Sequence, residues 1–360
     1  MARAGSGPAQ SVPAGSKMAE EVYKNIQVLK GVPADQVIPA MQFMSASLGV
    51  DCEHCHVEHA FDKDDKKPKQ TARKMAQMMF AINKDNFDGH REVTCYSCHH
   101  GVADPAGTPL IAEEEPKPDL RGEMHAGGAN PLDMPTPNQL LDKFVQALGG
   151  ADALQKISSR VEKGTLSGFG GRQVPVEVFG KAPDKRLSVM HLPNGDSITA
   201  YDGRVGWLGI PGRPPHEMSG GEVAGARLDA DFYFPVRVKQ MFSQLRVERT
   251  EKVGDEETYL VMAANPGQPP VRLYFSRQSA LLVRLMRYVD TPLGRNPTQI
   301  DYADYRDVDA IKVPFRWTLA RPGARFTIQV DQIQQNVPID DAKFAEPPAP
   351  APPAANPTSP

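Results

Sequence analysis

The chain has 360 residues, with 41 Lys and Arg against 44 Asp and Glu, which gives a formal net charge of −3 at pH 7. A chain of this length accommodates two domains, at roughly 150 residues for each. The slight acidic balance argues against a nucleic-acid-binding protein, which normally carries a basic surplus. No run of about 18 apolar residues occurs, so the sequence predicts no transmembrane helix.

Composition divides the chain into a leader and four further parts. Residues 1–17 are rich in Ala, Gly, Ser and Pro and lack the apolar centre of a signal peptide. Residues 18–105 hold all four cysteines and six of the nine histidines. Residues 106–136, rich in Pro, Gly and Glu, are expected to be a linker. Residues 137–346 form a predicted second domain, and residues 347–360 a Pro/Ala-rich tail.

Apolar residues at helical spacing predict several helices. Three fall in the first domain, at residues 18–29, 34–48 and 71–83. The second domain is expected to open with a helix from Pro137 to Leu148, because Pro suits a first helical turn and two glycines follow Leu148.

The four cysteines all lie in two C-x-x-C-H motifs, at residues 52–56 and 95–99, so none is left for a structural disulfide. In such a motif the two thiols add to the vinyl groups of a haem, and the histidine supplies an axial nitrogen to the iron. The sequence therefore predicts two covalently bound haem c groups. Their expected attachment points are Cys52, Cys55, Cys95 and Cys98, and their expected histidine ligands are His56 and His99.

Two other interpretations of these cysteines fit the spacing less well. A zinc site pairs two C-x-x-C elements about 15–20 residues apart, whereas forty positions separate Cys55 from Cys95. A thioredoxin-like disulfide is a single C-x-x-C near a βαβ pattern, and the sequence has no such pattern.

Methionines at helical spacing are candidates for the sixth iron ligand. Met41 lies eleven residues before Cys52, and Met75 lies twenty residues before Cys95. A methionine thioether raises the reduction potential of a haem and favours electron transfer. The alternative is that these methionines fill a core, as flexible thioethers often do. Periodicity alone leaves open that Met44, Met78 or Met79 takes the place of either.

The segment from Ile26 to Gly101 resembles one half of the tetrahaem cytochrome subunit of photosynthetic reaction centres. The matching stretches are IQVLKGVPADQVIPAM, ARKMAQMMFAIN and VTCYSCHHG. The resemblance implies that Met41 ligates the first haem iron and Met75 the second. Two features depart from that family, because this chain has two haem motifs where the subunit has four, and its second domain is unrelated.

The remaining polar residues of the first domain are expected to be peripheral. These include the histidines His54, His59, His90 and His100. A basic cluster could dock an acidic redox partner, but the interleaved Asp residues favour a solvated loop. The cluster comprises Lys63, Lys66, Lys67, Lys69, Arg73 and Lys74.

The second domain alternates apolar and polar residues in ten short segments between residues 174 and 334, which predict strands. The alternation breaks between Gly221 and Phe242, where one or two helices are expected. Trp207 and Trp317 are expected to lie in the core. The pattern from Asp304 to Pro347 resembles the periplasmic lipoprotein-carrier superfamily. That resemblance implies an unclosed β-barrel around helices, with an apolar cavity that could hold a lipid.

The fold class expected from these patterns is α+β with two domains. A small α-helical dihaem domain precedes a curved antiparallel domain like an unclosed β-barrel, with helices. The expected function is periplasmic electron transfer between unidentified redox partners, by a carrier rather than an enzyme. The alternatives are a dihaem peroxidase with one open iron, and a redox-linked protein that binds a lipid or a quinone.

Overall fold

The computed structural model describes residues 17–105, 134–169, 172–322 and 324–348. The chain divides into two compact units. The first unit comprises the chain up to Leu148 with residues 237–303 and 318–325, and the second comprises residues 149–236, 304–317 and 326 onward. Most of the predicted linker and tail lies outside the described residues, so the domain boundaries drawn from composition stay a prediction.

The helices of the described residues are α1 Ala19–Val22, α2 Val37–Leu48, α3 Cys52–Cys55, α4 Lys67–Asn86, α5 Tyr96–His99, α6 Pro137–Ala147, α7 Ala151–Gln155, α8 Gly220–Ala230 and α9 Phe234–Met241. Short 3-10 helices, η1 and η3, occupy Ala34–Gln36 and Asp341–Phe344. The strands are β1 Ser159–Phe169, β2 Arg172–Lys181, β3 Lys185–Leu192, β4 Gly195–Tyr201, β5 Gly206–Gly209, β6 His216–Glu217, β7 Gln244–Val253, β8 Glu256–Ala264, β9 Val271–Ser276, β10 Leu282–Asp290, β11 Arg295–Val308, β12 Ile311–Arg321 and β13 Ala324–Gln335.

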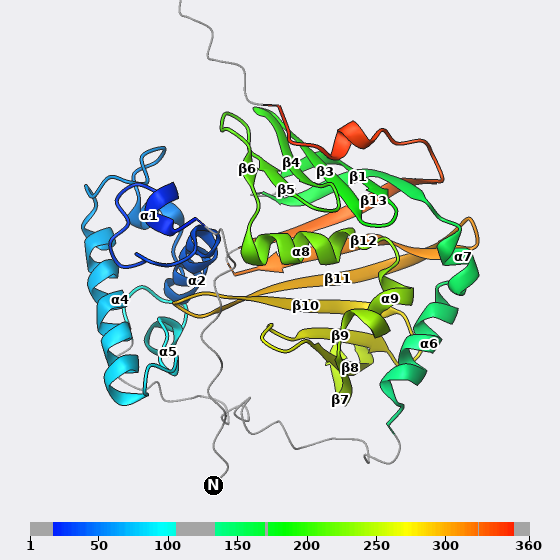
Figure 1. Ribbon diagram of the computed structural model, residues 1–360, viewed down its shortest axis with the longest axis horizontal. Helices are drawn as coiled ribbons and strands as arrows, with labels where there is room; N and C mark the ends of the chain where they lie inside the picture. Colours follow the sequence, from blue (N-terminus) through cyan, green and yellow to red (C-terminus); the bar gives the residue numbers. More distant parts are fainter. Residues whose placement is uncertain (1–16, 106–133, 170–171, 323, 349–360) are drawn as a thin grey trace, which may run out of the picture. The chain divides into compact units, whose positions relative to one another are not determined.

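The thirteen strands of the described residues form one sheet in the order β6-β5-β4-β3-β2-β1-β13-β12-β11-β10-β9-β8-β7 (Figure 1). Neighbours from β1 to β6 and from β7 to β11 pair antiparallel, and β13 pairs antiparallel with β1. Apart from the β1–β13 pair, sheet neighbours are therefore consecutive in the chain, as in a meander, while β6 and β7 form the two edges of the sheet. The expected α+β class with a curved, unclosed antiparallel sheet is confirmed.

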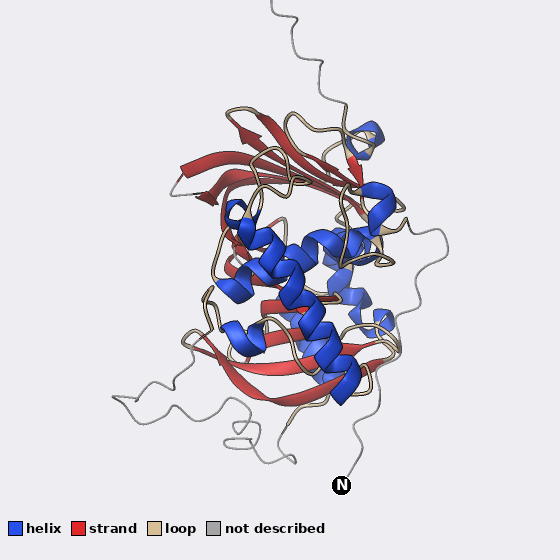
Figure 2. Cartoon of the chain, turned by 90° about the vertical axis from the view of Figure 1, so that its left-hand side faces the viewer, coloured by secondary structure: helices blue, strands red, loops and turns tan. Residues whose placement is uncertain are grey.

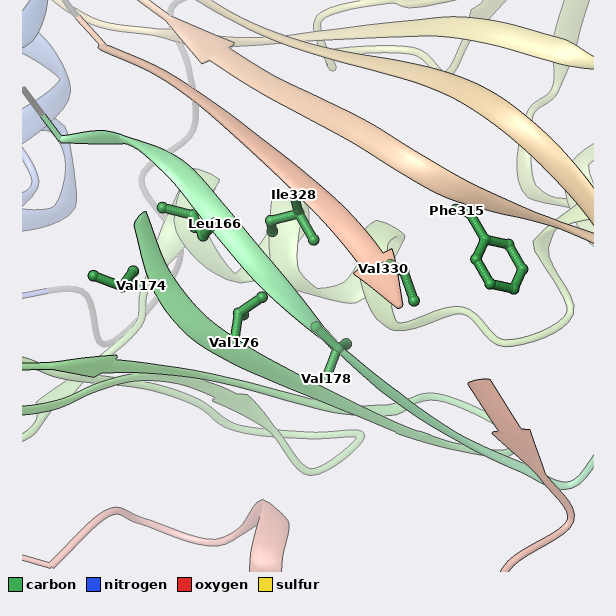
Figure 3. Close-up of a cluster of buried hydrophobic side chains, with 7 residues drawn as sticks. All are labelled: Leu166, Val174, Val176, Val178, Phe315, Ile328 and Val330. Carbon is green, nitrogen blue, oxygen red and sulfur yellow. The ribbon is translucent and has the colours of Figure 1, made fainter. Parts of the chain in front are cut away.

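The core of the second unit follows from strand periodicity. Val174, Val176 and Val178 alternate along β2 and are buried, while Glu177 between them carries a charge. Successive side chains of a strand point to opposite faces of the sheet, so these three valines share one face. Figure 3 shows the cluster that they join, which comprises Leu166, Val174, Val176, Val178, Phe315, Ile328 and Val330.

The helical segment of the first unit has a small core of its own. Residues 56–66 connect α3 to α4, and residues 87–95 connect α4 to α5; Figure 2 shows helices and loops in separate colours. Ala40 of α2 packs with Ala76 and Met79 of α4, and Leu293 from the turn between β10 and β11 is fully buried among them. A helical segment with so few large buried side chains gains little from its own apolar burial.

Three of the predicted helices match closely. Residues 34–48 form η1 and α2, residues 137–147 form α6, and α8 and α9 occupy the stretch where the alternation breaks. The expected helix at 71–83 is longer, because α4 begins at Lys67 with Pro68 in its first turn and ends at Asn86.

The expected helix at 18–29 is wrong, because only Ala19–Val22 is helical. Asn25 has a left-handed backbone with φ of 58°. Its Nδ2 donates to Asp62 O at 2.6 Å and to Asp64 Oδ1 at 3.0 Å. These long-range bonds replace the local helix, since an Asn side chain readily satisfies backbone groups outside helices.

Three strands were not anticipated, namely β1, β6 and β7. β7 is an edge strand in which five of ten residues are charged. Charges protect a sheet edge from pairing with other chains, and the same charges hide the apolar alternation. β1 departs from strict alternation at a bulge between Lys163 and Gly164.

Candidate haem sites

Each C-x-x-C-H motif forms a single helical turn. The backbone N–H of His56 donates to Cys52 O at 3.0 Å, and that of His99 donates to Cys95 O at 3.1 Å. Residues three apart on a helical turn lie on the same side of it. The two thiols of each motif are therefore brought to one side of their turn, as attachment to one porphyrin edge requires.

The imidazole of His56 is oriented by a backbone carbonyl. Its Nδ1 lies 2.9 Å from Phe61 O, and its ring lies 5.4 Å from the Phe61 ring. A carbonyl oxygen accepts hydrogen bonds and cannot donate them, so Nδ1 carries the proton in this contact. The lone pair of Nε2 is then available to a metal, and the carbonyl increases the basicity of the ring.

The second motif repeats this arrangement. Nδ1 of His99 lies 3.1 Å from Val102 O, three residues further along the chain. The turn that makes this possible has left-handed backbone at His100, with φ of 50°, and at Gly101, with φ of 89°. Both motifs therefore present a histidine whose Nε2 is the free ring nitrogen.

The loop that supplies the Phe61 carbonyl is held by the first turns of α4. Lys69 is buried, and its Nζ donates to Phe61 O at 2.9 Å and to Lys63 O at 2.6 Å. Asp64 lies 3.1 Å from Lys69 Nζ and accepts from Arg73 Nη1 at 2.7 Å. The Arg73 hydrogen bond, followed by that from Asn25, lowers the pKa of the Asp64 carboxyl.

These contacts change the expected role of the basic cluster. Lys69 and Arg73 turn inward, with side chains 10% and 15% exposed, so the expectation of a solvated loop is wrong for them. Lys66 Nζ donates to Glu53 O, within the first motif. Lys67 and Lys74 are exposed.

The second motif is tied to α4 by the buried side chain of Asn83. Its Oδ1 accepts from the backbone N–H groups of Glu92 and Val93 at 3.1 and 2.9 Å. Its Nδ2 donates to Val93 O at 2.7 Å. The side-chain amide of Asn83, near the end of α4, therefore holds the segment that leads into Cys95. The same helix carries Met75.

One thiol of each motif is disfavoured as a thiolate. Burial raises the pKa of the Cys55 thiol and that of the Cys95 thiol. A redox-active cysteine pair depends on a lowered thiol pKa, and the raised pKa of Cys55 and of Cys95 gives the disulfide interpretation no support from these two thiols. The described residues hold no group of three or more His, Cys, Asp or Glu suited to a metal ion.

The methionines separate by burial. Met79 is 4% exposed and belongs to the core of the helical segment. Met75 and Met78 are 40% and 48% exposed on the same helix. Met41 and Met44 are half-buried on α2 and pack beside the core. Burial therefore assigns Met79 to the core, and the choice among the other four stays a prediction.

The other histidines of the first domain lie at the surface, as expected. His54, His59, His90 and His100 are exposed. The described histidines of the second domain lie at hydrogen-bond distance from carboxylates, His191 from Asp196 and His216 from Glu222. Trp207 and Trp317 are half-buried and pack against apolar clusters, which agrees with the predicted core role.

The surface of the helical segment suits an apolar prosthetic group. Eight of the nine exposed large apolar side chains found among the described residues belong to residues 18–105. They are Val22, Ile38, Phe61, Met75, Met78, Phe87, Tyr96 and Val102, and the ninth is Ile210. Phe61, Tyr96 and Val102 lie in or beside the motifs. With paired thiols and an oriented imidazole at each motif, the residues present fit haem.

Similarity to known proteins agrees with this chemistry. Residues 3–138, less than half of the chain, match the family described as the photosynthetic reaction centre cytochrome C subunit. The subunit of Roseobacter denitrificans is 33% identical over 103 residues, which cover 26% of this chain and 28% of that protein. The subunit of Thermochromatium tepidum is 34% identical over 104 residues, covering 26% and 25%. Cytochrome c-554 of Chloroflexus aurantiacus is 35% identical over 85 residues, covering 22% and 20%.

Solved structures similar to the chain cover its β-rich part. A DUF1329 family protein from Desulfovibrio piger has 13% identity and a TM-score of 0.42, covering 58% of this chain and 96% of that one. A LolA superfamily protein from Nitrosomonas europaea has 13% identity and a TM-score of 0.40, covering 59% and 98%. Likeness at this level carries no argument about a ligand.

The described helices include none that is both long and apolar enough to cross a lipid bilayer. The chain spans about a quarter of the length of the reaction-centre relatives that it matches. Within that span the predicted resemblance is confirmed: the haem-motif segment resembles the cytochrome c subunit of photosynthetic reaction centres, a family that implies covalently bound haem c.

Proposed function

We propose that this protein is an exported c-type cytochrome that carries two haem c groups and passes single electrons between redox partners. The observation that carries the proposal is the repeated placement of histidine Nδ1 on a backbone carbonyl. His56 meets Phe61 O at 2.9 Å, and His99 meets Val102 O at 3.1 Å. Such a contact orients a ligating imidazole through its Nδ1–H and leaves Nε2 for the metal.

The cysteines hold the prosthetic group. Each thiol would hold the haem through a thioether bond, made by adding S–H across a vinyl group. Cys52 and Cys55 serve the first haem, and Cys95 and Cys98 serve the second. Because c-type haem is attached outside the cytoplasm, the proposed location is the periplasm.

Methionine is the proposed sixth ligand at both irons. Met41 and Met75 are assigned by the resemblance, and the exposure of Met75 is compatible with a ligand role because its thioether is not committed to the protein core. Haem iron supplies reversible one-electron exchange between its ferric and ferrous states. Iron held by both a thioether and an imidazole of this chain would offer no open site to peroxide, which favours a carrier over a peroxidase.

A redox titration of the matured holoprotein, followed by visible absorption, tests this function. We expect two one-electron transitions that are fully reversible, low-spin spectra in both oxidation states, slow binding of carbon monoxide, and no turnover of hydrogen peroxide. Rapid carbon monoxide binding by one ferrous haem, with peroxide turnover, would replace the carrier by an enzyme.

A further inference from the structure

The two oriented histidines differ in what else their carbonyl partner holds. Phe61 O accepts from His56 Nδ1 at 2.9 Å and also from Lys69 Nζ at 2.9 Å. Val102 O accepts from His99 Nδ1, and the described residues place no second donor on it. One histidine therefore shares its acceptor with an ammonium group, and the other does not.

The ammonium of Lys69 is held firmly in this place. Its side chain is 10% exposed, and it makes three contacts, with Phe61 O, with Lys63 O at 2.6 Å and with Asp64 at 3.1 Å. A charged group withdrawn from water acts more strongly on its neighbours than one at the surface.

The charge of Lys69 is not cancelled locally. Asp64 is its only recorded anionic partner among the described residues, and that carboxylate also accepts from Arg73 Nη1 at 2.7 Å. Two cations therefore share one anion, so the group formed by Lys69, Arg73 and Asp64 carries a net positive charge. No ammonium group of the described residues bonds to Val102 O, which accepts from His99 Nδ1.

Both effects of Lys69 act in the same direction on an iron bound to His56. A second donor on Phe61 O draws electron density from that oxygen, so the oxygen accepts less strongly from Nδ1–H and the imidazole becomes a weaker base. A less basic axial ligand stabilises ferric iron less. The nearby positive charge also disfavours the more positive ferric state.

We propose that Lys69 is a positioning residue that gives the haem at Cys52, Cys55 and His56 the higher reduction potential of the two. The inference rests on the proposed function, because it assumes a haem at each motif. It assigns a direction to electron flow along the chain: the centre at His99 is the donor and the centre at His56 the acceptor.

The test is a spectroelectrochemical titration of the full-length matured protein and three variants. Lys69→Met removes the donor and the charge while keeping an apolar stem, and Lys69→Gln keeps an N–H donor without the charge. Lys74→Met removes a charge from an exposed position of the same helix and is the matched control. Intact mass and the absorption spectrum establish beforehand that each variant carries both haems in low-spin form.

In Lys69→Met we expect the higher of the two potentials to fall by about 59 mV, a roughly tenfold change in the reduced-to-oxidised ratio, with the lower potential unchanged. Lys69→Gln is expected to give a smaller fall of the same potential. If Lys69→Met loses its first haem, the Gln variant alone shows whether Lys69 raises the potential of that haem. Lys74→Met is expected to shift neither.

Unchanged potentials in both Lys69 variants would overturn the proposal. A fall of the lower potential alone would also overturn it, because Lys69 would then act on the other haem. An equal fall of both potentials would overturn it too, because it would reflect a general loss of structure or a long-range charge effect. A wild-type protein with fewer than two haems would instead overturn the proposed function, and its mass reveals that before any titration.

Discussion

Gly101 donates its backbone N–H to Ser47 O at 2.9 Å, which fixes the end of α2 to the turn that follows the second haem motif. Gly49 ends α2 with a left-handed backbone, at φ of 66°, and lies against Gly101. A Cβ at Gly49 would lie 2.0 Å from Gly101 O. Glycine is therefore required at this position both by conformation and by space.

Gly49→Ala is expected to destabilise the helical segment by about 1–3 kcal/mol, because it adds left-handed strain to a backbone clash. Thermal unfolding followed by far-ultraviolet circular dichroism measures the effect. Gly89→Ala is the matched control, since Gly89 also has a positive φ, of 79°, but open space around it. Equal losses in the two variants would show that the contact with Gly101 is unimportant.

Asn83→Ala is expected to cost about 1–3 kcal/mol, because it leaves the N–H and C=O groups of the half-buried Val93 without this partner and takes one of two acceptors from the N–H of Glu92. We also expect reduced haem attachment at Cys95 and Cys98, measured by intact mass, with attachment at the first motif retained. Asn86→Ala is the control, as Asn86 is exposed and bonds to Ile82 O on its own helix. If the Asn86 variant loses as much haem as the Asn83 variant, Asn83 does not specifically hold the second motif.

Met41→His and Met75→His, made singly, are each expected to lower the potential of one haem and leave the other nearly unchanged. The reason is that a thioether favours ferrous iron more than an imidazole does. Redox titration measures both potentials. Met44→Leu and Met78→Leu are the controls, and a shift in either of these would mean that the ligand assignment is displaced along its helix.

The stability of the helical segment is expected to fall in acid because of Asp64. Hydrogen bonds from Arg73 and Asn25 lower the pKa of this carboxyl in the folded state. The unfolded chain, with an Asp pKa of about 3.9, therefore binds the proton first. The stabilisation is complete above that value and is lost as the pH falls through the lower folded-state pKa.

Asp64→Asn removes this dependence. We expect the variant to be less stable than wild type at pH 7 and to lose less stability between neutral and acid pH, measured by urea unfolding at several pH values. Asp65→Asn, at an exposed neighbour, is expected to follow the wild-type pH profile. A wild-type profile in the Asp64 variant would contradict the assigned role.

The cysteines and histidines of the haem sites could be predicted from sequence because their spacing is dictated by the porphyrin. The residues that orient them could not be. Phe61 acts through a backbone carbonyl, which every residue possesses, so its type carries no signal. Lys69 and Asn83 act across turns of the chain that periodicity does not define, and Lys69 looked like one of several surface lysines.

The fold was predictable where the apolar pattern is local. The valines of β2 and the helix from Pro137 follow directly from strand and helix periods. The segment around Asn25 was not predictable, because the bonds from its side chain to Asp62 and Asp64 outweigh a helical pattern. β7 was missed because an edge strand is stabilised by pairing and tolerates charge along its length.

The central claim is that both motifs bind haem covalently, each through its own cysteine pair. Intact-mass measurement of the full chain, expressed with a cytochrome-maturation system and extracted with acid acetone, tests it most directly. We predict a gain of two haem masses in the wild type, and of one in Cys52→Ala/Cys55→Ala and in Cys95→Ala/Cys98→Ala. A wild-type gain of one haem or none, or haem that acid acetone removes, would contradict the account.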